Sequence, residues 1–489
     1  MCTIWSTWRG RRLWGGAFAI VVLACSGTEP ILPTGSVRVT TATAGTDLDP
    51  DGYTVTLDEG QPQPVAVNGA VLLTGLTSGA HALALGGVAA NCIPNDANAS
   101  ALNVVAGDTA DVAFTVTCTS TFASVSVGYL FACGITIAGG TYCWGINQDG
   151  QLGHGATGPA ECFGYPCSII PVSVVGGLRF GTVSAGSDHA CGIAAGGAAY
   201  CWGDNAYGEL GDGTTVGKAA PVAVRGGLSF GALSTGAGHT CGVTNGGAVH
   251  CWGMNDSGQL GDGTTTDRIT PVAVLGGFTF ATVSASAGGG HTCGITTGGA
   301  TYCWGHNAFG ELGDGTTIDQ ASPVAVAGGA SFAAVSAGGG HTCGVTAAGV
   351  AYCWGYNNKG QVGDGTTTDR TSPVAVLGGI SFAVVSAGAG QTCGVTTTGG
   401  AYCWGWNSEG QLGDANRIDS ATPVAVWGGL SFAAVSSAGG GGYVTCGVTT
   451  SRTAYCWGDN SYGELGDAQA SSTPSAPYST VPVKVAGQP

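Results

Sequence analysis

Cysteine is the residue type whose number and spacing carry the most chemistry in this chain. Of its 20 cysteines, fourteen form seven pairs in which nine residues separate the two thiols. Thiolates also bind zinc, but this spacing lacks the C-x2-C knuckle of zinc sites. Regular pairing, in a chain whose first 25 residues resemble an export signal as described below, predicts disulfides and an oxidising compartment. The predicted pairs are Cys133 with Cys143, Cys191 with Cys201, Cys241 with Cys251, Cys293 with Cys303, Cys343 with Cys353, Cys393 with Cys403, and Cys446 with Cys456.

Histidine recurs two residues before the first cysteine of four pairs, at His189, His239, His291 and His341. Imidazoles arranged in a ring can bind a metal ion. The alternative, which we favour, is that each imidazole bonds a backbone group inside its own repeat. We therefore predict no metal and no other cofactor.

Aspartate follows Leu-Gly or Val-Gly in six repeats, where it could present an acidic binding surface. The spacing differs from that of a calcium-binding EF-hand loop. The alternative is that each carboxylate stabilises its own turn. The residues are Asp212, Asp262, Asp314, Asp364, Asp414 and Asp467, of which the first four are kept as candidate binding residues.

Other candidates are aromatic or lie in an insertion. Trp406 and Trp427 lie outside the repeated tryptophan and are of the type that anchors protein partners. The first repeat carries an insertion with its own cysteines, Cys162 and Cys167, which we expect to close a small disulfide loop suited to binding. No P-loop, Rossmann fingerprint or HExxH motif occurs, so the chain is predicted not to be an enzyme.

These residues are positioned by one repeated phrase, which is cleanest from Ser331 to Gly365. Each copy contains Cys-Trp-Gly and four strand-like runs, and it recurs about every 50 residues, as in propeller blades or β-solenoids. A hairpin centred on Ala348 places Cys343 opposite Cys353, at a separation that suits a disulfide. On the other face Gly344 lies opposite Tyr352, and the glycine should leave space for the ring.

The segments GHTCGVT, AYCWGYN and GQVGDGTT, followed by SPVAV, resemble the repeats of the regulator of chromosome condensation family. The resemblance covers residues 121–486 and implies a seven-bladed β-propeller. The founding activity of that family is nucleotide exchange on a small GTPase. It uses a protruding β-wedge, for which no equivalent segment is identified here.

The N-terminal quarter differs from the repeats. Residues 1–25 have basic, apolar and cysteine-ended parts, which are typical of a signal peptide, and the end at Cys25 resembles a bacterial lipobox. Residues 26–36 read as a tether. Residues 37–119 are predicted to form a small β-sandwich that resembles immunoglobulin-like or carboxypeptidase-regulatory-like modules, with Cys92 paired to Cys118.

Charge narrows the choice of partner. The formal net charge is −16, and such a surface repels the phosphates of nucleic acids. We therefore expect no nucleic acid as partner.

Together, the repeats and the N-terminal segment predict an all-β, exported protein. It would be either a lipoprotein of the outer surface or periplasm, with membrane contact only through the lipid, or a secreted protein. Its predicted role is that of a monomeric, non-enzymatic scaffold for another protein or a surface glycan. The alternatives are exchange-factor activity on a GTPase and a carbohydrate-binding or hydrolytic surface propeller.

Overall fold

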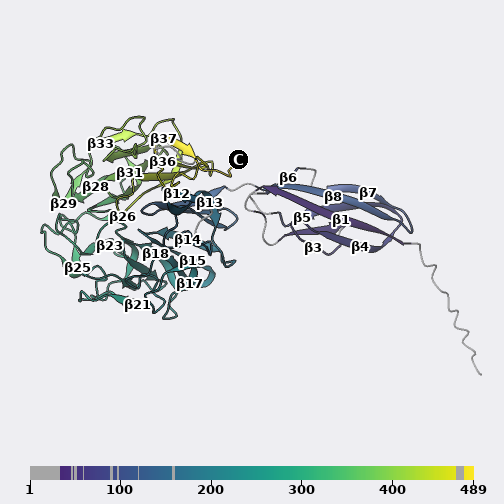
Figure 1. Cartoon of the computed structure of the whole chain (residues 1–489), viewed down its shortest axis with the longest axis horizontal. Helices are drawn as coiled ribbons and strands as arrows, with labels where there is room; N and C mark the ends of the chain where they lie inside the picture. The colour runs from purple at the N-terminus through teal and green to yellow at the C-terminus, as the bar shows by residue number, and fades with distance from the viewer. Residues whose placement is uncertain are drawn as a thin grey trace, which may run out of the picture.

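The computed structural model describes residues 34–488, except for 46–47, 49–51, 59, 89–91, 96–98, 119–120, 157–159 and 470–477. The described residues form 37 β-strands in nine sheets (Figure 1), and their one helical segment is a short 3-10 turn at Ala195–Gly197. The predicted all-β class is confirmed. Within these ranges no helix has the length and apolarity needed to cross a bilayer. Cys25 and the predicted signal peptide lie outside the described residues.

Two four-stranded sheets occupy residues 34–118. One consists, in spatial order, of β4 (Ala70–Thr77), β1 (Thr34–Gly45), β8 (Thr109–Cys118) and β6 (Cys92–Pro94). The other consists of β3 (Gln63–Val65), β2 (Tyr53–Leu57), β5 (Gly79–Gly86) and β7 (Ala99–Val104).

Alternation along β1 buries Val37 and Val39 in one core with Tyr53 and Phe114. The disulfide from Cys92 to Cys118 joins β6 to β8. One boundary differs from the prediction: residues 34–36, assigned above to the tether, begin β1, because they pair with the end of β4.

Residues 122–484 form seven further sheets, one per repeat, which we number 1 to 7 in chain order. The described strands of every sheet are consecutive in the chain, so the first and last repeats exchange none of these strands. Sheet 1 has an additional strand, β12 (Ala160–Cys162), at its edge.

The strands of sheets 1 to 7 fall into four positions. First strands are β9 (Phe122–Val127), β14 (Phe180–Ala185), β18 (Phe230–Thr235), β22 (Phe280–Ala285), β26 (Phe332–Ala337), β30 (Phe382–Ala387) and β34 (Phe432–Ser437). Second strands are β10 (Phe131–Thr136), β15 (His189–Ala194), β19 (His239–Thr244), β23 (His291–Thr296), β27 (His341–Thr346), β31 (Gln391–Thr396) and β35 (Val444–Thr449). Third strands are β11 (Thr141–Ile146), β16 (Ala199–Gly203), β20 (Val249–Gly253), β24 (Thr301–Gly305), β28 (Ala351–Gly355), β32 (Ala401–Gly405) and β36 (Ala454–Asp459). Fourth strands are β13 (Tyr165–Ser173), β17 (Lys218–Ala223), β21 (Arg268–Ala273), β25 (Gln320–Ala325), β29 (Arg370–Ala375), β33 (Ser420–Ala425) and β37 (Tyr478–Lys484).

The repeated cysteine pairs join the second and third strands inside each sheet. Cys343 lies directly opposite Cys353, as predicted, and the same register holds in all seven sheets. All fourteen cysteines are fully buried, so these disulfides are internal staples and present no sulfur to a ligand. The bonds join Cys133 with Cys143, Cys191 with Cys201, Cys241 with Cys251, Cys293 with Cys303, Cys343 with Cys353, Cys393 with Cys403, and Cys446 with Cys456.

The glycine beside each pair has a different role from the one expected. Gly344 does face Tyr352, but the space beside it is filled by Phe332 of the first strand. A Cβ atom at Gly344 would lie 2.7 Å from the Phe332 ring, so the glycine admits phenylalanine rather than tyrosine.

A closed circuit of serine hydrogen bonds links the first strands of all seven sheets. In each sheet the serine hydroxyl accepts a hydrogen bond of 2.9–3.0 Å from a backbone amide of the next first strand, as Ser336 does from Ala387. The circuit closes where Ser436 of sheet 7 accepts from Val127 of sheet 1. The sheets therefore form a ring (Figure 1).

Tryptophan joins each sheet to the one before it. The seven Cys-Trp-Gly tryptophans are fully buried. Each indole N–H donates a hydrogen bond of 2.8–3.0 Å to a backbone carbonyl of the preceding repeat. Trp354, for example, donates to the carbonyl of Glu311. Gly313 has φ +67° and lies against this indole, where a Cβ would be 2.6 Å from Nε1. The Leu-Gly-Asp glycine thus supplies both the turn and the space.

Replacing one of these tryptophans should cost more than most surface changes. We expect Trp354→Ala to lower the free energy of unfolding by about 3–5 kcal/mol, because a large buried side chain leaves a cavity between two sheets. Urea titrations compare it with Trp427→Ala, which removes an indole that is 62% exposed and should change stability by less than about 0.5 kcal/mol. Equal losses in the two variants would contradict the inter-sheet role.

Candidate functional site

The loops that follow the third strands lie together at one end of the ring, because they occupy the same place in each sheet. We call them the CWG loops; they comprise residues 146–150, 204–208, 254–258, 306–310, 356–360, 406–410 and 459–463, where Ile146 and Asp459 are the last residues of β11 and β36. Five of the fourteen residues at their first and fourth positions are phenylalanine, tyrosine or tryptophan. Phe309 and Tyr356 contact each other across sheets 4 and 5, with ring centroids 4.5 Å apart. The rings of Trp406 and Tyr443 of sheet 7 are in contact, with centroids 4.6 Å apart.

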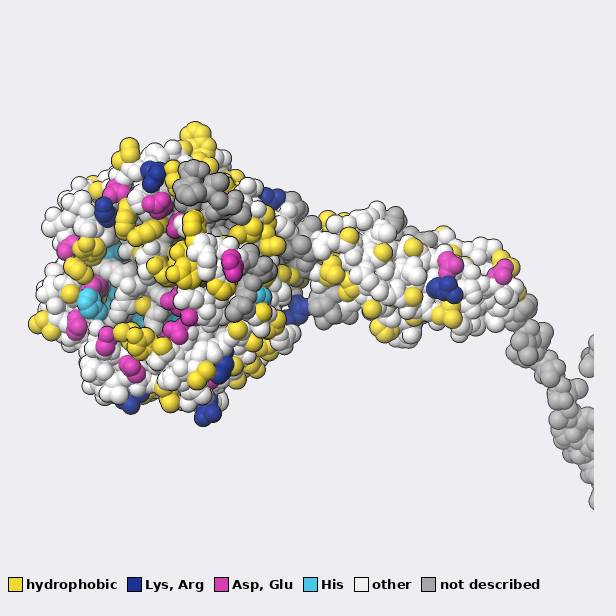
Figure 2. All heavy atoms as spheres, viewed as in Figure 1, with side chains coloured by type: hydrophobic (Ala, Val, Ile, Leu, Met, Phe, Trp, Pro, Cys, Tyr) yellow, Lys and Arg dark blue, Asp and Glu magenta, His cyan; other side chains and the backbone are white. Residues whose placement is uncertain are grey.

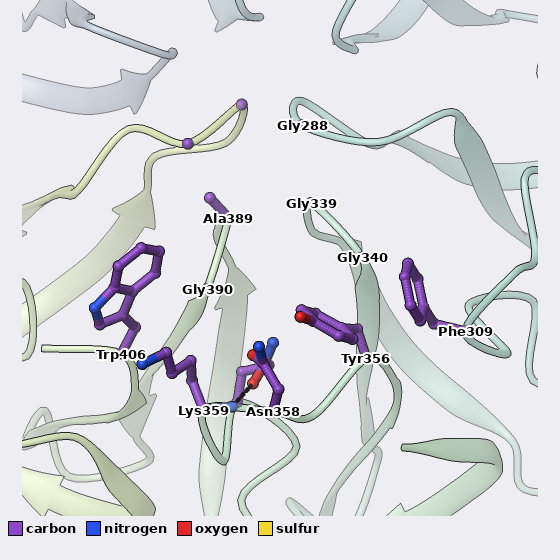
Figure 3. Close-up of a pocket in the computed structure, with 13 residues that line it drawn as sticks. Gly288, Phe309, Gly339, Gly340, Tyr356, Asn358, Lys359, Ala389, Gly390 and Trp406 are labelled. Atoms are coloured by element: carbon purple, nitrogen blue, oxygen red, sulfur yellow. Dashed lines mark hydrogen bonds between the residues drawn. The ribbon is translucent and has the colours of Figure 1, made fainter. Parts of the chain in front are cut away.

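A pocket of about 410 Å³ opens between these aromatic side chains (Figure 3). Phe309, Tyr356 and Trp406 form its walls, and Asn358 and Lys359 lie between them. Glycine backbone closes the inner side, including Gly288 and Gly440. Every lining residue lies in a loop.

The floor of the pocket is made by loops that meet across the ring. A Cβ at Gly288 of sheet 4 would lie 2.2 Å from the backbone nitrogen of Gly440 of sheet 7. Ser187 of sheet 2 donates its hydroxyl proton to the Ala287 carbonyl at 2.8 Å. These loops come from sheets on different sides of the ring and contact one another at this end of it.

Polar groups in the pocket are mostly donors. The Lys359 ammonium lies 5.2 Å from the centroid of the Trp406 ring and 3.2 Å from the Asp419 carboxylate. Gln361 is fully buried; its Oε1 accepts from the Lys359 backbone amide, and its Nε2 has no protein partner. An unpartnered buried donor costs free energy unless a ligand or water accepts from it.

A second exposed feature is the hairpin of β12 and β13. The disulfide between Cys162 and Cys167 closes it, as expected from the sequence. At its tip Phe163 has φ +51°, an unfavourable backbone conformation for a bulky residue, and is 53% exposed. Phe163 and Tyr165 both make edge-to-face contacts with Tyr462 of sheet 7, with ring centroids 6.2 and 6.1 Å apart.

The four repeated histidines do not line a surface. Each is fully buried, and its Nε2 lies 2.7–2.9 Å from a threonine hydroxyl of the next sheet. Thr392, the partner of His341, already donates its own proton to the Gln361 carbonyl, so His341 Nε2–H is the donor. The expected partner was therefore wrong: the bond goes to a neighbouring sheet and not to backbone of the same repeat. No group of three His, Cys, Asp or Glu side chains suited to a metal occurs among the described residues.

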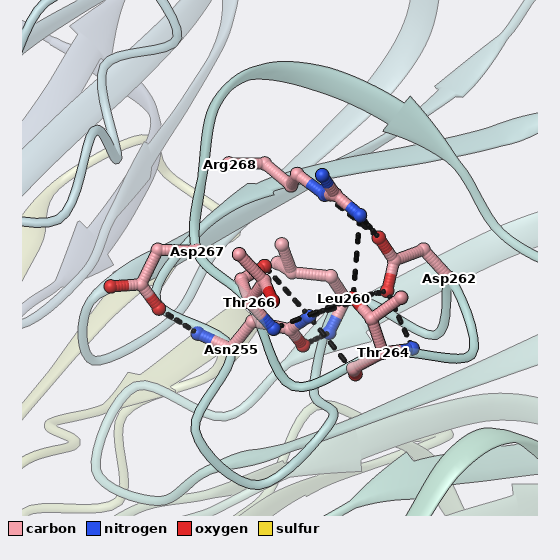
Figure 4. A network of polar contacts seen from close by, with 7 residues as sticks. All are labelled: Asn255, Leu260, Asp262, Thr264, Thr266, Asp267 and Arg268. Carbon is pink, nitrogen blue, oxygen red and sulfur yellow. Dashed lines mark hydrogen bonds and ion pairs between the residues drawn. The ribbon is translucent and has the colours of Figure 1, made fainter.

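The candidate aspartates bond within their own loops. Asp262 accepts from Asn255, from the amide and hydroxyl of Thr264, and from Arg268 (Figure 4). Burial alone would raise the pKa of Asp262, but the Thr264 and Arg268 donors hold it below its usual value. Asp212, Asp314 and Asp364 make the same contacts with the asparagine and threonine of their loops. The structure does not bring the four aspartates together.

Acidic groups that the sequence analysis missed lie in and beside the CWG loops of sheets 1 and 2. The pKa of Asp188 is raised to about 6, mainly by burial and to a smaller extent by the nearby negative charges of Asp149 and Asp204. Burial raises the pKa of Glu209 to about 8. Figure 2 shows acidic side chains both near the middle and toward the rim of one face of the ring, whereas the basic ones lie toward the rim.

Among the predicted residues, only Trp406 lies in the pocket. Trp427 is exposed and lies outside it. Phe309, Lys359 and Gln361 were not predicted. For Phe309 and Lys359 the available signal was the fourth position of the CWG loops, whose residue type varies between repeats as strongly as that of the first.

Comparison with known proteins agrees with this architecture. The model of the RCC1-like domain matches residues 95–446, and that of the regulator of chromosome condensation repeat matches residues 434–464. The chain is 32% identical to the ultraviolet-B receptor UVR8 of Arabidopsis thaliana over 196 residues, 39% of this chain and 43% of the receptor. It is 34% identical to the probable E3 ubiquitin-protein ligase HERC4 of Rattus norvegicus over 87 residues, 18% of this chain and 8% of the ligase. The matches thus span less than half of these curated relatives.

Solved structures share the fold at low sequence identity. Yeast RCC1 (Prp20), in a complex with Kap60, matches with a TM-score of 0.60 and 15% identity over 75% of this chain and 85% of Prp20. Human WBSCR16 matches with a TM-score of 0.58 and 20% identity over 65% of this chain and 86% of its own. Since the family model covers well over half of the sequence, this protein belongs to the RCC1-like domain family.

Proposed function

We propose that this protein is a non-enzymatic scaffold that presents one end of a seven-bladed β-propeller to a partner protein. In this proposal sheets 1 to 7 are the blades, and the sheets of residues 34–118 form a separate β-sandwich before them. The serine circuit and the buried tryptophans support a rigid ring, which would hold its loops in fixed positions. Rigid loops bind with less loss of conformational entropy than mobile ones.

The observation that carries the proposal is the hairpin tip. An exposed phenylalanine in a left-handed conformation is held at a cost of about 1–3 kcal/mol, and such strain is concentrated at functional sites. The disulfide and the Tyr462 contacts fix the tip before any partner arrives. Exposed, preorganised aromatic side chains are typical interface hot spots.

The setting we propose is outside the cytoplasm. Nine disulfides among the described residues favour an oxidising compartment. Attachment through Cys25 remains our proposal for how the protein is retained there. The net charge of −16 favours a basic partner protein over nucleic acid.

The alternative is nucleotide exchange on a small GTPase. Among the fold relatives, Prp20p of Saccharomyces cerevisiae has been described by its binding to Gsp1p and histones, with a TM-score of 0.59 and 16% identity over 75% of this chain and 87% of Prp20p. Relatives at this identity support a shared fold, and a protein partner is compatible with both proposals. Accelerated release of labelled GDP from a captured GTPase would favour exchange over the scaffold.

Affinity capture tests the hairpin directly. The chain from Ser26 onward is immobilised and exposed to host envelope and medium, and the enriched protein is then titrated against purified variants. We expect Phe163→Ala to weaken binding by about 30-fold, as loss of a hot-spot aromatic costs about 2 kcal/mol.

The matched control is Ile318→Ala, which removes an exposed apolar side chain from a loop of sheet 4, far along the chain from the hairpin. It should leave binding unchanged. Equal affinity of wild type and Phe163→Ala for the captured protein would reject the hairpin as the binding site.

A further inference from the structure

The pocket of the CWG loops has a chemistry distinct from that of the hairpin. We propose that it binds a single sugar ring of a polysaccharide, stacked on Trp406 and hydrogen-bonded by Gln361. The pocket is lined by loops that belong to sheets 4 to 7, whereas the hairpin belongs to sheet 1. This proposal therefore does not rest on the partner protein inferred above.

Its size and walls suit a sugar. A volume of about 410 Å³ falls in the range of roughly 300–1,000 Å³ that is usual for small-ligand sites. A pyranose ring has an apolar face of C–H groups and a rim of hydroxyls. Trp406, Tyr356 and Phe309 offer flat apolar surfaces on two sides of the pocket (Figure 3), which match such a face.

The polar groups select for a ligand that accepts hydrogen bonds. Gln361 lines the pocket, and its Nε2 is a fully buried donor without a protein partner. A sugar hydroxyl that accepts from it would remove the cost of leaving this donor unpaired. Asn358, which is exposed at the same site, can donate or accept and so suits the hydroxyl rim.

Other ligand classes fit less well. A cationic ligand would meet the Lys359 ammonium, which already lies over the Trp406 ring. An anion would find Lys359 paired with Asp419 on a strongly acidic protein. An extended peptide would find only loops and no free strand edge, so it would gain no ladder of backbone hydrogen bonds.

Gel electrophoresis of the folded chain through soluble polysaccharides tests the site. The probes are neutral (hydroxyethylcellulose, xylan, glucomannan), amino-sugar (glycol chitin) and acidic (polygalacturonate, alginate). We expect retardation by at least one of them, followed by calorimetry with its oligosaccharide. Trp406→Ala should weaken binding about 10-fold or more, since it removes the stacking surface.

Two matched pairs separate binding from folding. Trp427→Ala removes an exposed tryptophan outside the pocket, and its affinity should equal that of wild type. Gln361→Met should weaken binding several-fold, whereas Gln411→Met should not. Gln411 makes the same local bond, to the Glu409 amide, and also has an unpartnered Nε2, but it lies outside the pocket.

Three results would overturn the proposal. The first is that no probe retards the folded protein. The second is that Trp406→Ala and Trp427→Ala bind alike, or that Gln361→Met and Gln411→Met do. The third is that Trp406→Ala abolishes capture of a protein partner while no polysaccharide binds, which would assign the pocket to protein docking.

Discussion

Refolding in the presence of reductant should fail for this protein. Each repeat disulfide closes a loop of ten residues, which removes about 2.5–3 kcal/mol of conformational entropy from the unfolded chain. Seven such crosslinks together exceed the roughly 5–15 kcal/mol by which folded domains are usually stable. The reduced chain therefore should not recover its ring.

The sulfurs are fully buried, so reductant has to be added while the protein is unfolded. The chain is unfolded in guanidinium with phosphine, then diluted, and near-ultraviolet circular dichroism reports tertiary packing. The control undergoes the same cycle without phosphine and should recover. Recovery of the native signal and urea midpoint in reductant would show that packing alone holds the sheets.

Acid should destabilise the protein through its buried histidines. Burial lowers the pKa of His189, His291 and His341 to about 3 and that of His239 to about 4. Nε2 is committed to threonine, so a second proton would go to Nδ1, which is buried and has no partner. The unfolded value is about 6.5, so the unfolded chain binds more protons, and stability falls as pH drops from 6.5 toward 3.

The prediction is sharpest as a difference between two proteins. Gln391 occupies the histidine position in sheet 6, so His341→Gln should preserve the fold. Wild type should lose about 1.4 kcal/mol per pH unit more than this variant below pH 6.5, or about 3 kcal/mol by pH 4. Urea titrations at several pH values measure the gap.

Carboxyl groups contribute the opposite pH dependence. Burial raises the pKa values of Asp188, Glu209 and Glu464, so protonation of these groups favours the folded state as pH falls. They are present in both proteins and cancel in the difference. The control is His81→Gln, since hydrogen bonds to the Thr77 carbonyl and to Asp58 raise the pKa of His81 and its loss should not flatten the profile. A constant gap between wild type and His341→Gln would contradict the buried-neutral assignment.

The candidate site was less predictable than the fold. Trp406 stood out as a tryptophan outside the repeated Cys-Trp-Gly, whereas Phe309 lies at an equally variable loop position and was not singled out. The significance of Gln361 could not be read from the chain, because glutamine or glutamate fills its position in every repeat. In the structure Gln361 lines the pocket described above, and its Nε2 has no protein partner.

The repeats, the strands and the disulfide register could all be predicted from the amino-acid sequence. These features depend on contacts within about 10 residues, where the two-residue period of a strand dictates which side chains face each other. The contacts between sheets could not be predicted in this way: the bond from His341 to Thr392, the meeting of Gly288 with Gly440, and the pocket above them. Those contacts depend on how the ring closes and how neighbouring sheets pack, which no local pattern encodes.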